Sequence, residues 1–241
     1  MERENKITVL DFGGQYAHLI AKRVRHLGYY ADIMHPDVTL EALGRPGGII
    51  LSGGPSSVYS ESAPPFNNDI LDAGIPVLGL CYGMQLIANI LGGEVKRLDR
   101  QEYGRADLSV QGESKLFNKL KENEQVWMSH GDSVASPPKG FEVIGRTSDC
   151  PVAAIGNAAS NVYGLQFHPE VTDTPSGDTI LKNFIAICGL EKNWSMDGYI
   201  EEKMKEVRER VGDRNVFLLV SGGVDSTVTM TLLNNALGKD R

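Results

Sequence analysis

The sequence is poor in cysteine: there are 3 in 241 residues, at positions 81, 150 and 188. A small odd number excludes the disulfide framework of a secreted domain, and no Cys-x-x-Cys or Cys/His cluster has zinc-finger spacing. The sequence also lacks a long apolar run. The N-terminus is charged, and its short apolar run ends at Asp11. We therefore expect no signal peptide or membrane span, and a cytoplasmic protein.

Positive charge is not in excess either. Lys+Arg number 24 and Asp+Glu 31, which gives a net charge of −7. This balance argues against nucleic acid or a membrane surface as a partner, although a local nucleotide site remains compatible with it. With 41% hydrophobic and 23% charged residues, the composition is that of an ordinary globular protein with one large domain or two small ones.

The first 90 residues alternate short apolar runs with amphipathic patterns. Strands are predicted at 7–10, 49–51 and 76–80, and helices at 15–27 and 82–91. Such alternation predicts an α/β fold with a mostly parallel sheet flanked by helices.

The pattern changes after Gly93. Shorter strand-like pieces, broken by Gly, Pro and Ser, continue to Gln166 and predict antiparallel or mixed strands added to the first sheet. A helix at 179–188 closes a first domain that we assign to residues 1–190.

The last fifty residues predict the start of a second domain. Residues 191–215 are interpreted as a linker and an amphipathic helix. Within 216–241, an apolar strand at 216–220 leads through a Ser-Gly-Gly turn into a helix that reaches Leu237. A single strand with two helices is too little for a domain, so we expect this piece to be a fragment of a second α/β nucleotide-binding domain.

Cys81 lies between an apolar strand and a helix, with Gly79 and Gly83 close on either side. Such a strand–turn–helix elbow presents a nucleophile at a helix N-terminus, where the reactive thiolate is favoured. A buried structural cysteine is an equally good interpretation of the elbow alone.

His168 and Glu170 flank Pro169, which favours an extended chain with both side chains on the same side. By itself this is typical of a surface turn. Together with a thiol at the edge of the same sheet, it completes a Cys–His–carboxylate set for nucleophilic catalysis.

Two glycine-rich turns complete the set of candidate sites. Ser52-Gly53-Gly54-Pro55 follows a strand, and its backbone N–H groups, with that of Tyr82, could form an oxyanion hole. Alone, this turn is a weak signal. The loop between the last strand and helix favours phosphate binding by a helix N-terminus, with an ordinary capped turn as the alternative. Its residues are Ser221, Gly222, Gly223, Val224, Asp225, Ser226 and Thr227.

These motifs resemble known families. Gly-Leu-Cys-Tyr-Gly-Met-Gln at 79–85, Ser-Gly-Gly-Pro at 52–55, Met-Ser-His-Gly-Asp at 128–132 and His-Pro-Glu at 168–170 are similar to class I glutamine amidotransferases, which have a flavodoxin-like fold. Ser-Gly-Gly-Val-Asp-Ser at 221–226 resembles the pyrophosphate loop of N-type ATP pyrophosphatases. The two in this order resemble the glutamine-hydrolysing GMP synthase family, ligases of purine biosynthesis.

The resemblance implies roles for individual residues. Cys81 would be the nucleophile, His168 the base and acid, and Glu170 the partner of the imidazole. Gly54 and Tyr82 would form the oxyanion hole, and the pyrophosphate loop would hold ATP. Candidates for holding glutamine are Gln85, Ser129, His130, Gly131 and Asp132, although for His130 a loop-stabilising role is at least as good an interpretation.

The resemblance also implies ligands. Glutamine is the substrate of a step that needs no cofactor or metal, whereas ATP, Mg²⁺ and XMP belong to the second domain of the intact enzyme, which is a homodimer through a further region. We expect this chain to be a truncated form that lacks most of that second domain and cannot make GMP alone.

Two other functions remain open on the sequence alone. The first domain could be a glutamine-binding regulatory module with a misaligned triad. It could also be another hydrolase with a cysteine elbow, such as a peptidase, although the Ser-Gly-Gly-Pro and Met-Ser-His-Gly-Asp motifs suit a small amide better.

Overall fold

The structure, a computed structural model, describes residues 4–241; for residues 98–101 it describes the backbone but not the side chains. Contacts divide it into two compact units, Met1–Asn193 and Trp194–Arg241. The assignment of residues 1–190, 191–215 and 216–241 to named domains stays a prediction.

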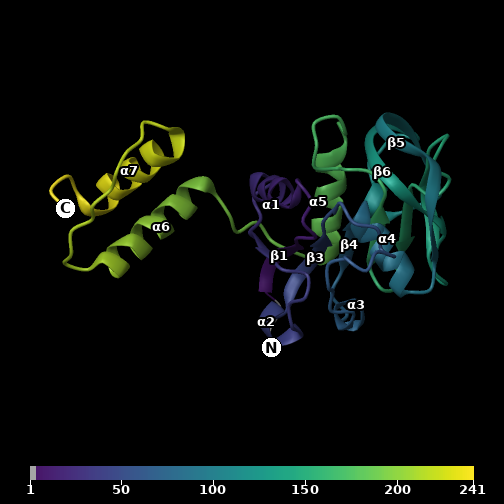
Figure 1. The fold of residues 1–241 in the computed structure, drawn as a ribbon, viewed down its shortest axis with the longest axis horizontal. Helices are drawn as coiled ribbons and strands as arrows, with labels where there is room; N and C mark the ends of the chain where they lie inside the picture. Colours follow the sequence, from purple (N-terminus) through teal and green to yellow (C-terminus); the bar gives the residue numbers. More distant parts are fainter. Residues whose placement is uncertain (1–3) are drawn as a thin grey trace. The chain divides into compact units, whose positions relative to one another are not determined.

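The first unit is built on one mixed sheet (Figure 1), to which the described residues contribute nine strands in the order β2-β1-β3-β4-β9-β8-β7-β5-β6. The strands are β1 (Glu4–Leu10), β2 (Ala31–Met34), β3 (Pro46–Leu51), β4 (Val77–Leu80), β5 (Glu94–Val110), β6 (Asn123–Ser136), β7 (Glu142–Arg146), β8 (Ala154–Asn157) and β9 (Val162–Leu165). Neighbouring strands from β2 to β9 in this order are parallel, and those from β9 to β6 antiparallel. The predicted α/β class, with a mixed sheet flanked by helices, is confirmed for this unit. The predicted start of a second α/β domain is not part of this result.

Helices cover both faces of the parallel strands. Ile50 of β3 packs in one cluster with residues of α1 and α5, whereas Ile49 and Leu51 pack in another with residues of α4 and the short α2 and α3. The helices of this unit are α1 (Ala17–His26), α2 (Leu40–Leu43), α3 (Asp69–Asp72), α4 (Tyr82–Ile90), the 3₁₀ turn η1 (Lys115–Phe117) and α5 (Gly177–Cys188). Because β3 is covered on both sides, its apolar run is continuous rather than alternating.

The second unit differs from the sequence prediction in one element. Its helices α6 (Met196–Val211) and α7 (Val224–Leu237) lie where they are predicted. The predicted strand at 216–220 is wrong: no strand is found there, and Phe217 and Leu219 are 87% and 79% exposed. A β-strand needs a neighbouring strand to satisfy its backbone groups, and nothing within residues 194–241 supplies one.

Membrane insertion of a helix finds no support in the described part of the chain, where each helix is too short or too polar to span a bilayer.

Candidate active site

The candidate catalytic residues follow two adjacent parallel strands. Leu80, the last residue of β4, is in register with Leu165, the last residue of β9. Cys81 therefore leaves the sheet beside Gln166, and His168 follows two residues later. Open α/β sheets bind ligands at this carboxyl edge, because loops and helix N-termini converge there.

Cys81 occupies the predicted elbow between β4 and α4. Its φ and ψ are +50° and −106°, a region that residues with a side chain seldom adopt. The Cys81 N–H donates to the Leu165 carbonyl at 2.7 Å, which holds the bend in place. A side chain at Gly83 would place its Cβ 2.5 Å from the Leu51 carbonyl oxygen, so α4 can approach β3 only because this residue is glycine.

The thiol of Cys81 is surrounded by polar groups although the residue is only 7% exposed. It lies 3.4 Å from the Ser129 carbonyl oxygen and accepts from the Gln166 side-chain amide at 3.5 Å. Cys81 also contributes to the raised pKa of His168, so the thiol and the ring lie within reach of each other. A thiol held in this way is positioned for attack rather than packed as a small hydrophobic group.

His168 and Glu170 form a buried pair. The Nδ1 of His168 lies 2.7 Å from Oε1 of Glu170, with the side chains 5% and 0% exposed. Because the carboxylate can only accept, Nδ1 carries a hydrogen, and the other ring nitrogen is available to the thiol. Thr174 donates its hydroxyl to the His168 carbonyl at 2.7 Å, and Arg23 donates to the Glu170 carbonyl at 2.9 Å, so both backbones are fixed.

The charge state of His168 follows from these contacts. Burial by itself lowers the pKa of His168, but the hydrogen bonds with Cys81 and Glu170 and the charge of the carboxylate outweigh it and raise the pKa to about 10. The ring is therefore an imidazolium at neutral pH, ready to protonate a leaving amine.

We expect the His168 ring to stay protonated from pH 7 to 9, whereas an unperturbed imidazole titrates near pH 6.5. Glu170→Gln removes the negative charge that favours the imidazolium, so the His168 pKa should fall. Titration of the ring ¹⁵N chemical shifts by NMR measures both. A ring that loses its proton near pH 6.5 in the wild type would contradict the imidazolium assignment.

The Ser52–Pro55 loop lies against the thiol and the imidazole. A Cβ at Gly53 would be 3.2 Å from the His168 ring and 3.7 Å from Cβ of Cys81, so a side chain there would crowd the site. Tyr82 is the first residue of α4, where N–H groups have no acceptor within the helix. The placement suits the predicted oxyanion hole of Gly54 and Tyr82, whose role stays a prediction.

The predicted glutamine-binding residues lie on β6 and α4, and two of them are linked to the thiol, Ser129 directly and Gln85 through Gln166. The buried Gln85 side chain donates to the Asp132 carbonyl at 2.7 Å and to the Gln166 amide oxygen at 3.2 Å. Ser129 presents its carbonyl to Cys81. The His130 ring, in contrast, binds the Glu102 carboxylate and the Asp132 carbonyl, which agrees with the structural alternative for this residue. Direct contacts of Gln85, Ser129, His130, Gly131 and Asp132 with glutamine stay predictions.

The predicted phosphate loop lies in the second unit, at the N-terminus of α7. Gly222 has φ +82°, and Gly223 caps the helix without a side-chain hydrogen bond. Ser226 and Thr227 donate their hydroxyls to the Gly223 carbonyl. Most of the loop is exposed, so the first N–H groups of α7 are accessible, but phosphate binding stays a prediction.

Sequence reasoning missed three contributors to the site. Gln166 contacts the thiol, the Tyr16 ring packs edge-on against His168 with centroids 5.1 Å apart, and Arg23 fixes the Glu170 backbone. The alternation of an extended chain, which places Gln166 on the same side as His168, was a usable signal for the first. No local pattern identifies the other two. Tyr16 comes from the loop at 13–16, and Arg23 comes from α1.

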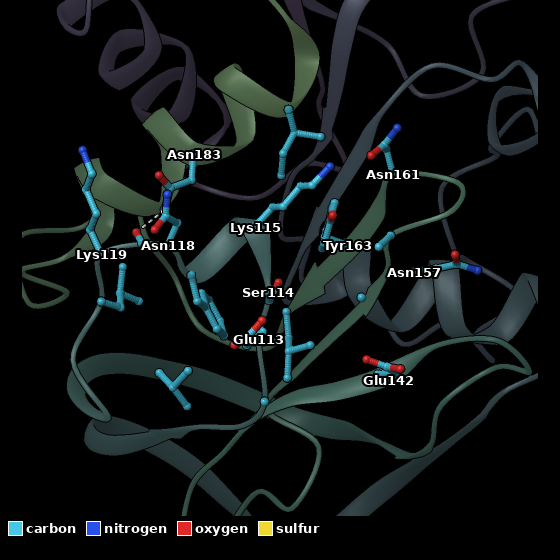
Figure 2. Close-up of a pocket in the computed structure, with 18 of the residues that line it drawn as sticks. Glu113, Ser114, Lys115, Asn118, Lys119, Glu142, Asn157, Asn161, Tyr163 and Asn183 are labelled. Carbon is cyan, nitrogen blue, oxygen red and sulfur yellow. Dashed lines mark hydrogen bonds between the residues drawn. The ribbon is translucent and has the colours of Figure 1, made fainter.

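A separate cavity of about 1300 Å³ lies at the opposite edge of the sheet (Figure 2). Among the residues that line it are Asn161, which precedes β9, Tyr163 of β9, Asn157 at the end of β8 and Asn183 of α5. None of the predicted catalytic residues does, because they follow the other end of β9. This cavity is therefore distinct from the candidate active site.

The sequence model of the family described as "Glutamine amidotransferase class-I" matches residues 8–188. The chain belongs to this family. Its matched region coincides with the first unit and contains the whole cysteine, histidine and glutamate constellation.

Relatives of this amidotransferase are named GMP synthase [glutamine-hydrolyzing]. The Lactobacillus gasseri protein is 48% identical over 97% of this chain and 46% of its own length. The Clostridium kluyveri protein is 46% identical over 99% of this chain and 47% of its own length. The chain thus spans about half the length of the curated relatives it matches.

A solved structure of similar extent also resembles this amidotransferase. It is a candidate GMP synthase subunit from Thermoplasma acidophilum, with a TM-score of 0.69 and 30% identity. The match covers 84% of this chain and 99% of the other. The predicted resemblance to the glutamine-hydrolysing GMP synthase family is thereby confirmed.

Proposed function

We propose that the chain hydrolyses the side-chain amide of glutamine through Cys81, His168 and Glu170. The observation that carries this proposal is the contact of an elbow thiol with a buried imidazolium–carboxylate pair, in a chain of the class I amidotransferase family. Such a set supplies a nucleophile, a proton shuttle and a fixed orienting group.

The chemistry follows from the geometry. Cys81 attacks the amide carbon as the thiolate, and the oxygen becomes an oxyanion that the N–H groups of Gly54 and Tyr82 stabilise. His168 then donates its proton to the departing nitrogen, which leaves as ammonia, and a γ-glutamyl thioester remains. The now neutral His168 takes a proton from water, whose oxygen attacks the thioester. Glutamate is released and the thiolate is restored.

The relatives are named GMP synthase [glutamine-hydrolyzing]. We propose that the ammonia released by this chain serves the ATP-dependent amination of XMP to GMP, a ligase reaction. The contacts with XMP and those of a homodimer belong, in this proposal, to the part of the relatives that this chain does not span.

For ATP, the residues present fit a phosphate group. The exposed N-terminus of α7, which no side chain caps, offers N–H donors, and the Ser221 hydroxyl lies beside it. Ser226 and Thr227 would have to release the Gly223 carbonyl before their hydroxyls could donate to a phosphate. Bound ATP with Mg²⁺ would activate the acceptor by providing the leaving group that ammonia displaces. The chain's own contribution would be to hold the departing phosphates.

A glutamine analogue with a reactive carbon at the γ-position tests the hydrolase proposal. We expect it to add to Cys81 alone among the three cysteines, as seen by peptide mass spectrometry, and free glutamine to protect against it. Peptides that contain glutamine should not protect, which separates this activity from a peptidase. A chain that binds glutamine but forms no adduct would be a regulatory module instead.

A further inference from the structure

A second cluster of titratable side chains, separate from the candidate catalytic residues, lies on β5, β6 and the β7–β8 connection. Glu102 of β5, His130 of β6 and Cys150 of the β7–β8 connection bring one ligand atom each within 4.8 Å of one another. Glu102 and His130 are directly opposite in the antiparallel pair of β5 and β6. The side chains of His130 and Glu102 are 1% and 13% exposed, and Cys150 is fully buried. Cys81, His168 and Glu170 are not members of this cluster.

The hydrogen bonds of His130 indicate that a cation belongs in this cluster. Its Nδ1 lies 3.0 Å from the Asp132 carbonyl oxygen, which can only accept, so Nδ1 carries a hydrogen. Its Nε2 lies 3.1 Å from a carboxylate oxygen of Glu102. In a neutral imidazole this arrangement directs the Nε2 lone pair at an anion, which is repulsive. Either a proton or a metal ion must lie between them.

The surroundings favour a metal ion, because each of the three donor groups has an outer partner. Asp132 fixes the tautomer of His130, Thr147 donates its hydroxyl to the other oxygen of Glu102 at 3.4 Å, and the Ser133 hydroxyl is 3.4 Å from the Cys150 sulfur. Metal-binding histidines and carboxylates in proteins are oriented by such second contacts.

The spacing fits a small divalent ion of borderline softness. In a tetrahedral zinc site, bond lengths of about 2.0–2.3 Å place nitrogen, oxygen and sulfur ligands about 3.3–3.6 Å apart. The observed separation of 3.1 Å between His130 and Glu102 is already close to this value. A nitrogen, an oxygen and a sulfur ligand together suit Zn²⁺ better than Mg²⁺ or Ca²⁺, which prefer oxygen alone.

We propose that Glu102, His130 and Cys150 bind one Zn²⁺ ion. On binding, the Cys150 S–H bond breaks, its proton passes to solvent, and the sulfur and the metal form a bond. Cys150 is fully buried, so in this proposal the metal takes the place of its proton. The partly exposed Glu102 marks the entry path, and a water molecule completes the coordination.

The site adjoins the predicted glutamine-binding residues through β6. The Asp132 carbonyl that orients His130 also accepts from Gln85, and the preceding Ser129 carbonyl contacts the Cys81 thiol. A metal ion on His130 would therefore hold the Asp132 backbone and, through it, the Gln85 side chain in place. This role is structural, because none of the three ligands contacts the catalytic triad.

The test uses the full chain carrying Cys81→Ala, so that the elbow thiol cannot bind the metal. The chain is stripped with a chelator and titrated with Co²⁺ alone and then with Zn²⁺ alone. We expect one Co²⁺ per chain with a thiolate-to-cobalt charge-transfer band, displacement of Co²⁺ by Zn²⁺, and a melting temperature raised by Zn²⁺. None of these readouts involves glutamine hydrolysis, so failure of the metal titration would leave the proposed function intact.

Matched variants locate the ion. In the same background, Cys150→Ser should abolish the charge-transfer band, Thr147→Val should weaken Zn²⁺ binding by about 10- to 100-fold, and Cys188→Ser should leave the band unchanged. The proposal is overturned if the Cys81→Ala chain, which keeps all three ligands, binds no Co²⁺ or gives no thiolate band. His130 and Glu102 would then be joined by their 3.1 Å hydrogen bond alone.

Discussion

Replacing Cys81 by alanine should reduce glutamate release from glutamine by on the order of 10⁴–10⁶-fold, because the nucleophile and the covalent route are lost together. The fold should persist, since the change removes one sulfur atom from a position at the edge of the sheet. A coupled assay for glutamate measures the rate, and circular dichroism verifies the fold.

Cys188→Ala provides the matched control for this prediction. Cys188 is buried at the end of α5 and packs in the core cluster of that face. Its loss should lower the free energy of unfolding while most of the glutaminase rate is kept. If the Cys81→Ala chain retained more than about one hundredth of the wild-type rate, the covalent mechanism would be wrong.

Replacing Glu170 by glutamine should lower the rate by on the order of 10⁴-fold, a typical loss when the buried acid behind a catalytic imidazole becomes an amide. Glutamine retains the shape but removes the charge that stabilises the imidazolium of His168. An amide N–H can also donate to Nδ1 and so stabilise the wrong tautomer. The kcat for glutamate release should fall far more than KM changes.

Asp173→Asn is the control for this second prediction. It is also an acid-to-amide change, only three residues away, but Asp173 forms an exposed ion pair with Arg105. Ion pairs of this kind contribute about 0–1 kcal/mol to stability, so the rate should change less than about twofold. An equal loss in both variants would indicate general disruption of the loop rather than a role for the Glu170 carboxylate.

Local sequence patterns were sufficient for the elements that position the nucleophile. An apolar run, a cysteine between nearby glycines and an amphipathic run predict β4, the elbow and α4, because each of these depends on neighbours in the chain. The same reasoning predicted a strand at 216–220 that does not form. There the local preference is present, but pairing with another strand depends on residues that are distant in sequence or outside residues 194–241.

The contacts around the thiol were predictable only in part. His168 and Glu170 are two residues apart, so their alignment follows from an extended chain. Tyr16 and Arg23 reach the pair from other segments, and no spacing in the sequence indicates their distances. The cluster of Glu102, His130 and Cys150 gave no signal at all, because its members come from three separate strands or loops.

By itself, the sequence determined the α/β class, the elbow at Cys81, the His168–Glu170 pair and the family to which they belong. These features are encoded in short stretches, where periodicity, glycine and proline act on adjacent residues. Only the tertiary structure decided that β4 lies beside β9, so that thiol and imidazole meet, and that β5 faces β6 with Glu102 opposite His130. The order and register of strands depend on which buried faces pack together, and that is a property of the whole chain.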